Sequence, residues 1–386
     1  MKKLISVLGS TGSIGLTTLK ILDKKKNYFK PYLFSANKNY FLICKQIKKY
    51  KPIYFLVNDN KMYEKVKKKF KTHNTQIINK LEKNNFKISN ITVAAIPGIA
   101  GLFPTIFMIK KSKKILIANK ESIICGWHLI NSECIKYKTK IIPIDSEHFS
   151  ILKLLENVKL NQIKKVYLTA SGGPFLGFTE KKLKKIKPSD ALKHPKWNMG
   201  KKISIDSSSL MNKVLEYIEA QKLFKLPKEK LDILIHPESL VHAVIKYKNG
   251  LTKFIYHETS MIVPIANAIF DKNFEIDKFH KSKIGVNNLT FKEPDKNNFP
   301  IIKVLNKVNE HHSSAIIVNA SNEILVDYFL RKKVPFLGIP HVIQQILKDR
   351  NYKKYAIKRT KNINQINKIN MWARLKTIEK IKAKYG

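Results

Sequence analysis

Two short stretches of the chain hold most of the side chains that could bind a charged ligand. The longer one, residues 171–219, begins with SGGPF at Ser171 and continues through HPKWNMG and SIDSSSLMNKVLEYIE. The shorter one is DSEH at residues 145–148. Few cores need so many hydroxyl, amide, ammonium and carboxylate groups in so little chain, because a buried polar group costs free energy unless it is hydrogen-bonded. Together the two stretches predict a metal site with a phosphate pocket beside it.

The predicted metal ligands are carboxylates. Asp145 and Glu147 follow an apolar run, IIPI, at residues 141–144. If the chain stays extended there, the two side chains at i and i+2 point to one side. Carboxylate oxygens suit Mg²⁺ or Mn²⁺ better than Zn²⁺, and Glu216 is the candidate third ligand. A solvated strand end without a metal is the alternative for an isolated pair of this kind.

The segment around Glu216 predicts a helix with a polar first turn. Asn212, Lys213 and Glu216 lie at i, i+1 and i+4, close enough to share one face. The DSSS run at residues 206–209 is a plausible N-cap for this helix. The alternative is that Lys213 and Glu216 form an ordinary surface ion pair of little energetic weight.

An apolar tip and two histidines complete the candidate substrate region. Trp197 and Met199, beside Gly200, are typical of a flap that closes over a substrate, although simple packing would also explain them. His236 and His242 flank PESLV. Each could instead be a core histidine that is hydrogen-bonded to the backbone.

The N-terminus predicts a nucleotide site. GSTGSIG at residues 9–15 stands between an apolar strand (4–8) and a helical pattern, where dinucleotide-binding folds place the pyrophosphate on free N–H groups. The spacing is GxxGxxG rather than GxGxxG, so a plain strand–turn–helix junction is the alternative. The second strand ends in SANKN at residues 35–39, with no carboxylate for a ribose hydroxyl, and Lys38 favours the 2′-phosphate of NADP. Lys38 could also be just one of many lysines.

The order of elements predicts an α/β fold. Apolar strands alternate with amphipathic helices up to Asp145, as parallel βαβ units do. We expect four segments: an N-terminal Rossmann-like NADP-binding domain (1–145), an α/β catalytic domain (146–270) with a flap at about 191–201, a polar linker (271–297) and a C-terminal α-helical domain (298–386). The strands that we predict are 4–8, 31–36, 53–57, 91–95, 115–118, 140–144, 164–171, 231–237 and 241–248.

Composition excludes several classes of protein. The 386 residues carry a formal charge of +46, but only four of the basic residues are arginines. Specific nucleic-acid readers favour arginine, so we expect no specific nucleic-acid partner and interpret the lysines as drift in an AT-rich bacterial genome. No apolar run is long enough to span a membrane, and we expect no signal or transit peptide. Three scattered cysteines, Cys44, Cys125 and Cys134, indicate a reducing cytoplasm.

Eight motifs, in order along the chain, resemble those of the 1-deoxy-D-xylulose-5-phosphate reductoisomerase family. They are GSTGSIG (9–15), LIANKES (116–122), PIDSEH (143–148), SGGPF (171–175), HPKWNMGKKISIDS (194–207), MNKVLEYIEA (211–220), IHPESLVH (235–242) and NASNE (319–323). The resemblance implies rearrangement of 1-deoxy-D-xylulose 5-phosphate and its reduction by NADPH to 2-C-methyl-D-erythritol 4-phosphate, in the methylerythritol phosphate route to isoprenoid precursors. It also implies a divalent metal (Mg²⁺, Mn²⁺ or Co²⁺) and a homodimer, with dimerisation through the catalytic domain.

The resemblance also implies roles for individual residues. The metal ligands would be Asp145, Glu147 and Glu216. The residues that bind substrate or support catalysis would be Lys120, Ser146, His148, Ser171, His194, Trp197, Met199, Ser207, Asn212, Lys213 and His242. The cofactor would be lined by Gly9, Thr11, Gly12, Ser13, Ile14, Ala36, Asn37, Lys38, Asn39, Asn119, Glu121 and Gly200.

Three departures from the family pattern stand out. Asn37 replaces a glycine near the adenine end, Val214 replaces a glycine in the metal helix, and TSMIV (259–263) replaces a PDMR-type segment. A decayed, inactive homologue is therefore one alternative. Another is an NADP enzyme of the aspartate-semialdehyde dehydrogenase type, but that chemistry needs an activated cysteine, and Cys125 and Cys134 have no histidine placed to activate them.

Overall fold

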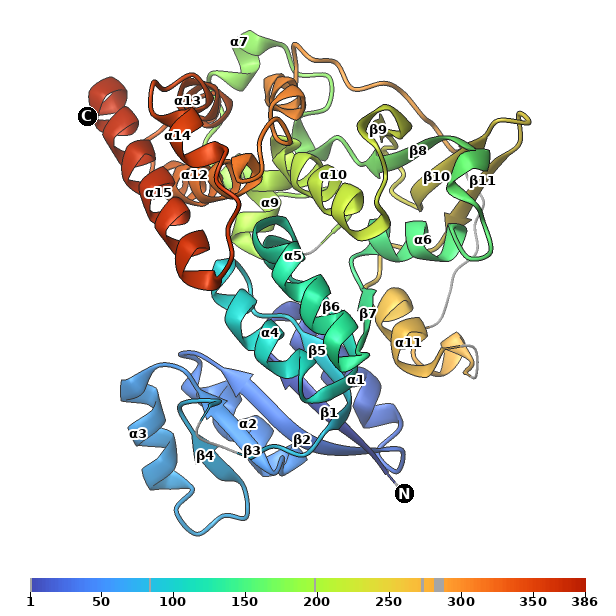
Figure 1. Ribbon diagram of the computed structural model, residues 1–386, viewed down its shortest axis with the longest axis vertical. Helices are drawn as coiled ribbons and strands as arrows, with labels where there is room; N and C mark the ends of the chain where they lie inside the picture. Colours follow the sequence, from blue (N-terminus) through green and yellow to red (C-terminus); the bar gives the residue numbers. More distant parts are fainter. Residues whose placement is uncertain (1, 83–84, 198, 272–273, 281–287) are drawn as a thin grey trace. The chain divides into compact units, whose positions relative to one another are not determined.

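The computed structural model describes residues 2–82, 85–197, 199–271, 274–280 and 288–386 (Figure 1). The chain divides into two compact units, which are described separately here. Unit 1 comprises Met1–Ser122, His128–Phe149 and Ser260–Ile284, and unit 2 comprises Ile123–Trp127, Ser150–Thr259 and Gly285–Gly386. Within the described ranges, no helix is both long enough and apolar enough to cross a membrane.

The described residues of unit 1 form a seven-stranded parallel sheet in the order β4-β3-β2-β1-β5-β6-β7. Its strands are β1 (Lys3–Leu8), β2 (Phe29–Ala36), β3 (Tyr54–Val57), β4 (Gln76–Ile78), β5 (Ser89–Ala94), β6 (Ser112–Ile117) and β7 (Lys140–Pro143). Helices cover both faces of such a sheet, so its strands are nearly continuous apolar runs; Ile5, Val7 and Val93 are fully buried. The strand order reverses between β1 and β5, and ligands of doubly wound sheets bind at that point, beyond the carboxyl ends of the strands.

Most helices of unit 1 follow the strands in turn. They are α1 (Ser13–Lys24), α2 (Tyr40–Tyr50), α3 (Asn60–Lys69), η1 (Ile99–Gly101) and α4 (Leu102–Ile109), with α11 (Ile262–Phe270) and η5 (Ile276–Lys278) added from later in the chain. The helices α5 (Lys120–Tyr137) and α6 (Ser146–Leu154) each have residues in both units. Helix α11 packs on α1 and β6, and Phe270 contacts the rings of Tyr28 and Phe29. Helix α11 therefore belongs to the core of unit 1.

The described part of unit 2 has a four-stranded mixed sheet in the order β11-β10-β8-β9. Its strands are β8 (Ile163–Ala170), β9 (Leu231–Ile235), β10 (Val241–Tyr247) and β11 (Thr252–Tyr256). Its helices are η2 (Leu160–Gln162), η3 (Gly173–Phe175), α7 (Glu180–Leu183), α8 (Pro188–Ala191), α9 (Lys201–Ser208), α10 (Met211–Phe224), η4 (Lys228–Lys230), η6 (Pro300–Asn306), α12 (Ser314–Leu330), α13 (Gly338–Leu347), α14 (Tyr352–Ala356) and α15 (Ile363–Tyr385). Helix α10 packs on β8 and β9, while α12 contacts α9, α13 and α15. Ser171, Ser207 and Asn212 are thus all held on or beside these packed elements.

The fold class is confirmed, with a parallel N-terminal sheet and a helical C-terminus. Two local predictions are wrong. The chain after Asp145 is not extended: the Asp145 carboxylate accepts a hydrogen bond from the N–H of Ser146 at 3.0 Å, and its carbonyl accepts one from Phe149, so α6 begins at once. The DSSS run is not an N-cap but the end of α9. Leu210, which has a left-handed backbone conformation with φ of 62°, separates this run from α10.

The serines explain the second error, because a serine hydroxyl can satisfy a helical carbonyl as well as cap a helix. The hydroxyl of Ser208 donates to the carbonyl of Ile205 at 2.8 Å. Strands β4 and β11 had no clear pattern in the sequence. The boundaries of the three predicted domains stay a prediction.

Candidate functional site

The glycine turn after β1 is closed too tightly for side chains at two positions. Gly9 has φ of +78°, and a Cβ there would lie 2.6 Å from the carbonyl oxygen of Ala95, in the loop after β5. A Cβ on Gly15 would lie 2.4 Å from the carbonyl oxygen of Gly9. The loops after β1 and β5 therefore touch at the switch point only because glycines stand there.

The turn leaves the N–H groups at the start of α1 available to an anion. The N–H of Gly9 donates to the hydroxyl oxygen of Ser35 at 3.0 Å, and the N–H of Gly12 donates to the carbonyl oxygen of Gly9 at 3.0 Å. Helix α1 has no side-chain cap, so Ser13 and Ile14 present N–H groups at the positive end of the helix dipole. Such an end suits a pyrophosphate.

The polar residues after β2 have structural roles of their own. Asn39 caps α2 by accepting a hydrogen bond from the N–H of Leu42 at 3.1 Å. Lys38 is exposed, and its ammonium is 3.9 Å from the carboxylate of Asp59. Ala36 is buried and Asn37 is exposed. The exposed ammonium of Lys38 suits a phosphate group, and its role in cofactor choice stays a prediction.

Asn119 ties two loops of unit 1 together. Its side-chain oxygen caps α5 at the N–H of Ser122, while its amide nitrogen donates to the carbonyls of Gly98, at 2.9 Å, and Ile96. Glu121, in the first turn of α5, is buried. Asn119 therefore holds the loop after β5 against α5, and direct contact of Asn119 and Glu121 with a cofactor stays a prediction.

Unit 1 gathers a charged cluster at the end of β7. The Lys120 ammonium is 3.0 Å from the Asp145 carboxylate, and the His148 ring is 3.8 Å from it. Burial by itself would raise the pKa of Asp145, but Lys120 and then His148 outweigh it, so that pKa lies well below its usual range. The Ser146 hydroxyl donates to Glu147 at 2.7 Å. Asp145 is therefore ionised at neutral pH, and together with Glu147 it fits a hard divalent cation.

In unit 2, His194 orients Ser171. The Nδ1 atom of His194 accepts from the N–H groups of Lys196 and Trp197, at 3.1 and 2.9 Å. The proton of the neutral ring is therefore on Nε2, which donates to the Ser171 hydroxyl oxygen at 3.1 Å. That oxygen also accepts from the N–H of Gly173 at 3.1 Å. Burial lowers the pKa of His194, which favours this neutral form. Because the Ser171 oxygen is an acceptor in both hydrogen bonds, its hydroxyl can donate to a different group.

The SGGPF turn lies directly against the end of α9. Gly173 has φ of +64°, and a Cβ there would lie 3.0 Å from Cα of Ser208 and 3.1 Å from the carbonyl oxygen of Ser207. Ser171 and Ser207, far apart in the sequence, are therefore brought onto two elements in direct contact.

Helix α10 carries a buried ion pair. The Lys213 ammonium is 2.6 Å from a Glu216 carboxylate oxygen, with 5% and 1% of the two side chains exposed. The amide of Asn212 donates to the other carboxylate oxygen of Glu216. The interpretation as a surface pair is wrong. Burying an ion pair rarely adds stability by itself, so stability alone does not explain this pair.

The two histidines have different environments. His236 is the core histidine foreseen as the alternative: its Nδ1 bonds the carbonyl of Thr290, and its Nε2 accepts from the N–H groups of Leu240 and Val241. His242 stacks on His257 with ring centroids 4.0 Å apart, and the Trp197 ring is 6.0 Å from His242. Nothing in the sequence singled out His257. The flap thus reaches His242 through Trp197.

The remaining flap residues are less constrained. Met199 is half-buried, and Gly200 is exposed and is the N-cap residue of α9. Residue 198 of the predicted flap lies outside the described residues.

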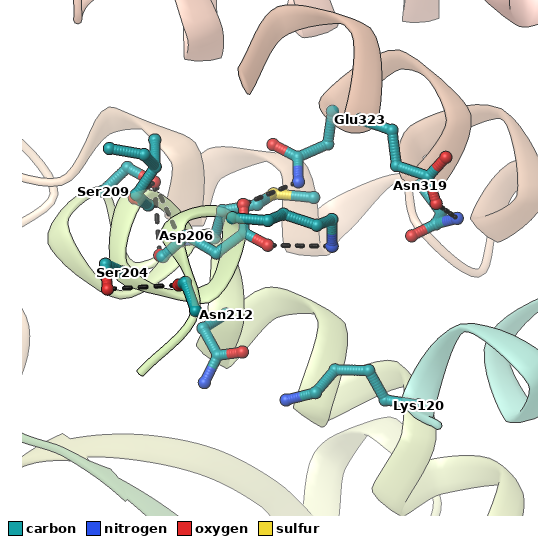
Figure 2. A network of polar contacts seen from close by, with 12 residues as sticks. Lys120, Ser204, Asp206, Ser209, Asn212, Asn319 and Glu323 are labelled. Carbon is teal, nitrogen blue, oxygen red and sulfur yellow. Dashed lines mark hydrogen bonds and ion pairs between the residues drawn. The ribbon is translucent and has the colours of Figure 1, made fainter. Parts of the chain in front are cut away.

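Asp206 was expected only as part of the DSSS cap, but the structure gives it other partners. It is 1% exposed and belongs to a polar network of α9 and α12 in unit 2. Figure 2 labels Asp206 of α9, Ser209 directly after that helix, and Asn319 and Glu323 of α12. Its partner Asn322 belongs to the NASNE motif, to which the sequence analysis assigned no role.

Comparisons with known proteins agree along the chain. Residues 5–126 match the family model for 1-deoxy-D-xylulose 5-phosphate reductoisomerase, and residues 141–224 and 257–376 match two models for C-terminal domains of that enzyme. The reductoisomerase of Pelagibacter ubique is 44% identical over 387 residues, which cover 97% of this chain and 98% of the relative. The enzyme of Wolbachia pipientis wMel is 39% identical over 90% of each chain.

Solved structures of reductoisomerases have the same fold. The enzyme of Zymomonas mobilis in complex with NADPH has a TM-score of 0.88 at 28% identity and covers 99% of both chains. A reductoisomerase in complex with NADPH, fosmidomycin and magnesium has a TM-score of 0.91 at 28% identity and covers 98% of both chains.

Proposed function

Since the chain belongs to the 1-deoxy-D-xylulose 5-phosphate reductoisomerase family, we propose that the side chains described above form its catalytic site. The enzyme is an NADP-dependent oxidoreductase. It converts 1-deoxy-D-xylulose 5-phosphate to 2-C-methyl-D-erythritol 4-phosphate with NADPH and a divalent metal, in the methylerythritol phosphate pathway. The assignment of individual residues is the part that requires testing.

Asp145, Glu147 and Glu216 are the proposed metal ligands. They are anionic oxygen donors, as Mg²⁺, Mn²⁺ and Co²⁺ accept. When bound, the cation polarises the ketone and a neighbouring hydroxyl oxygen of the substrate. Lys120 keeps Asp145 ionised, and Ser146 holds Glu147 through its hydroxyl. Lys120 and Ser146 also have donors that suit the substrate oxygens.

Ser171, Ser207, Asn212 and Lys213 are the proposed phosphate ligands. Hydroxyl, amide and ammonium donors suit a phosphate dianion, and His194 holds the Ser171 oxygen so that its proton points to an acceptor other than His194. The observation that best supports this assignment is the buried Lys213–Glu216 pair: α10 presents a cation for the phosphate and an anion for the metal one turn apart. Phosphate binding away from the reacting carbons would orient the substrate.

Trp197 and Met199 are proposed to cover the bound substrate, which would exclude water from the reactive aldehyde intermediate. His148 and His242 would contact the substrate or its near neighbours. The proposed cofactor residues are Gly9, Thr11, Gly12, Ser13 and Ile14 at the pyrophosphate, Ala36, Asn37, Lys38 and Asn39 at the 2′-phosphate, and Asn119, Glu121 and Gly200 elsewhere.

A homodimer in the cytoplasm is the proposed working form. All three cysteines are free and buried, which suits a reducing compartment. Size-exclusion chromatography with light scattering would decide the oligomeric state, and a mass of one chain at assay concentration would contradict the dimer. A small phosphorylated sugar is the proposed partner, with no specific nucleic acid.

Direct measurement of Mn²⁺ binding tests the ligand set without relying on turnover. We expect Asp145→Asn, Glu147→Gln and Glu216→Gln each to weaken Mn²⁺ binding at least about tenfold, or about 1.4 kcal/mol, in calorimetry or in the loss of free-ion spin resonance. Asp232→Asn, at an exposed carboxylate paired with Lys165, is the control and should bind Mn²⁺ normally. Wild-type affinity in all three variants would refute the assignment.

A further inference from the structure

The NASNE motif lies in α12, more than a hundred residues after the phosphate ligands, and the proposed function gives it no role. Its fourth residue, Asn322, is fully buried. The amide nitrogen of Asn322 donates to the Asp206 carboxylate at 2.8 Å. Asp206, labelled in Figure 2, immediately precedes Ser207 in the sequence of α9. The motif therefore contacts the helix that carries a proposed phosphate ligand.

Asp206 is a buried charge that needs its partners. Its side chain is 2% exposed. One carboxylate oxygen accepts from Asn322, and the other is 3.0 Å from the ammonium of Lys202, one turn earlier on α9. Removing a partner of a buried carboxylate is costly, because the remaining charge is left unsolvated. The geometry of α9 is thus coupled to the position of Asn322.

Helix α9 is short and packs on α8, α10, α12 and η3. It has eight residues and no side-chain N-cap, and serines in its last turns are weak helix formers. The C-terminal end of α9 packs closely on the Gly173 turn, because a Cβ on Gly173 would be 3.0 Å from Cα of Ser208. A small rotation of α9 would therefore change the spacing of Ser207 and Ser171.

Helix α12, by contrast, is fixed from its other side. Glu323 pairs with Arg374 of α15 and accepts from the amide of Asn319 at 3.2 Å. Arg374 also donates to Asn370 of α15 at 2.8 Å. These bonds, with the packing of α12 on α15, make α12 a firm base for the Asn322 side chain.

We propose that Asn322 is a positioning residue for phosphate binding: through Asp206 it sets the rotation of α9, and so places Ser207 beside the SGGPF turn. The inference rests on the proposed role of Ser207 as a phosphate ligand. The helical C-terminal part of the chain thereby contributes to substrate affinity without touching the substrate. A misplacement of about 1 Å at such a distance from the chemistry can cost about 100-fold in rate, so a modest change of α9 is measurable.

The test compares three variants with a matched control. Asn322→Leu removes the hydrogen bond, Asn322→Asp places a second carboxylate against Asp206, and the double variant Asp206→Asn/Asn322→Asp restores an amide–carboxylate pair with the roles exchanged. The control, Asn319→Leu, alters an equally buried asparagine of α12 whose amide donates to Glu323 and to the sulfur of Cys125. For each variant we would measure KM for 1-deoxy-D-xylulose 5-phosphate, KM for NADPH, the inhibition constant of inorganic phosphate and the Tm.

We expect both single Asn322 variants to raise the substrate KM and the phosphate inhibition constant about tenfold, or about 1.4 kcal/mol, with the NADPH KM unchanged. The double variant should recover most of this loss, and Asn319→Leu should lower the Tm without changing phosphate inhibition. Equal loss of phosphate affinity in Asn319→Leu, or no recovery in the double variant, would overturn the inference. If Asn322→Asp does not fold, Asn322→Leu and the control decide.

Ser207→Ala separates this inference from the proposed function. If Ser207→Ala leaves the phosphate inhibition constant unchanged, the assignment of Ser207 itself fails. If Ser207→Ala weakens phosphate binding while both Asn322 variants bind phosphate normally, only the role of Asn322 is refuted.

Discussion

Replacing Gly15 by alanine should damage the nucleotide turn, although glycine-to-alanine changes inside helices usually help. A typical helix gains about 0.5–1 kcal/mol from that change. Here the new Cβ would lie 2.4 Å from the carbonyl oxygen of Gly9 and 2.6 Å from Cα of Ser10. A normal C···O contact is about 3.3 Å or more, so backbone atoms have to move by roughly 1 Å.

Overpacking of this kind costs about 1–3 kcal/mol, which outweighs the helix gain. We expect a net loss of about 1–2 kcal/mol, which lowers the Tm of a unit of this size by roughly 2–8 °C. Because the displaced backbone is the proposed pyrophosphate site, the NADPH KM should also rise at least about tenfold. Thermal melts and steady-state titration of NADPH would measure both effects.

Gly12→Ala is the matched control for this prediction. The nearest atom to a Cβ on Gly12 is the Gly9 carbonyl oxygen at an ordinary 3.4 Å, so the fold should lose at most about 1 kcal/mol, the usual worth of an N-cap change. Its methyl group would stand at the start of α1 and should weaken NADPH binding with little change in Tm. If Gly15→Ala melts and binds NADPH like the wild type, the reasoning about the turn is refuted.

Three further predictions follow from charges and hydrogen bonds. Burial lowers the pKa of His194, so on acidification the imidazole takes up a proton at a higher pH in the unfolded chain than in the folded one. The stability contributed by the neutral ring is therefore complete above the unfolded-state pKa and is lost as the pH falls below that pKa. The Tm difference between wild type and His194→Gln should therefore shrink from about pH 7.5 to about pH 5.5; a constant difference would contradict this. Lys213→Met removes the ammonium partner of the buried Glu216 carboxylate and should cost about 3–5 kcal/mol in urea unfolding, whereas Lys213→Met/Glu216→Leu should recover much of it. The +46 charge should give binding to random duplex DNA that falls steeply between about 50 and 200 mM salt, and a sequence preference that survives high salt would refute the interpretation of the lysines as drift.

The parallel sheet of unit 1 was predictable because each of its longer strands is a separate apolar run between helical patterns. β4 is only three residues long and β11 is mostly exposed, so neither has the hydrophobic pattern that marks a strand. Residue types likewise pointed to the carboxylates and hydroxyls of the candidate site, because ligand chemistry restricts the choice of side chain.

Local geometry was harder to predict where one side chain can serve two purposes. Asp145 was expected in an extended segment, yet α6 begins directly after it, and its carboxylate accepts from the N–H of Ser146. The serines before Asn212 were expected to cap α10, yet they end α9. Long-range partners such as Asp206 and Asn322 could not be paired from the sequence, because nothing in a single sequence says which buried carboxylate meets which amide.

The most direct test of the account is NADPH oxidation with 1-deoxy-D-xylulose 5-phosphate, measured with and without Mg²⁺ or Mn²⁺ for the wild type and Glu216→Gln. We expect the loss of NADPH absorbance to require both substrate and metal, and we expect Glu216→Gln to fold and bind NADPH but not to turn over. A wild-type protein that binds NADPH but does not oxidise it would contradict the claim of activity, and a fully active Glu216→Gln would contradict the proposed site.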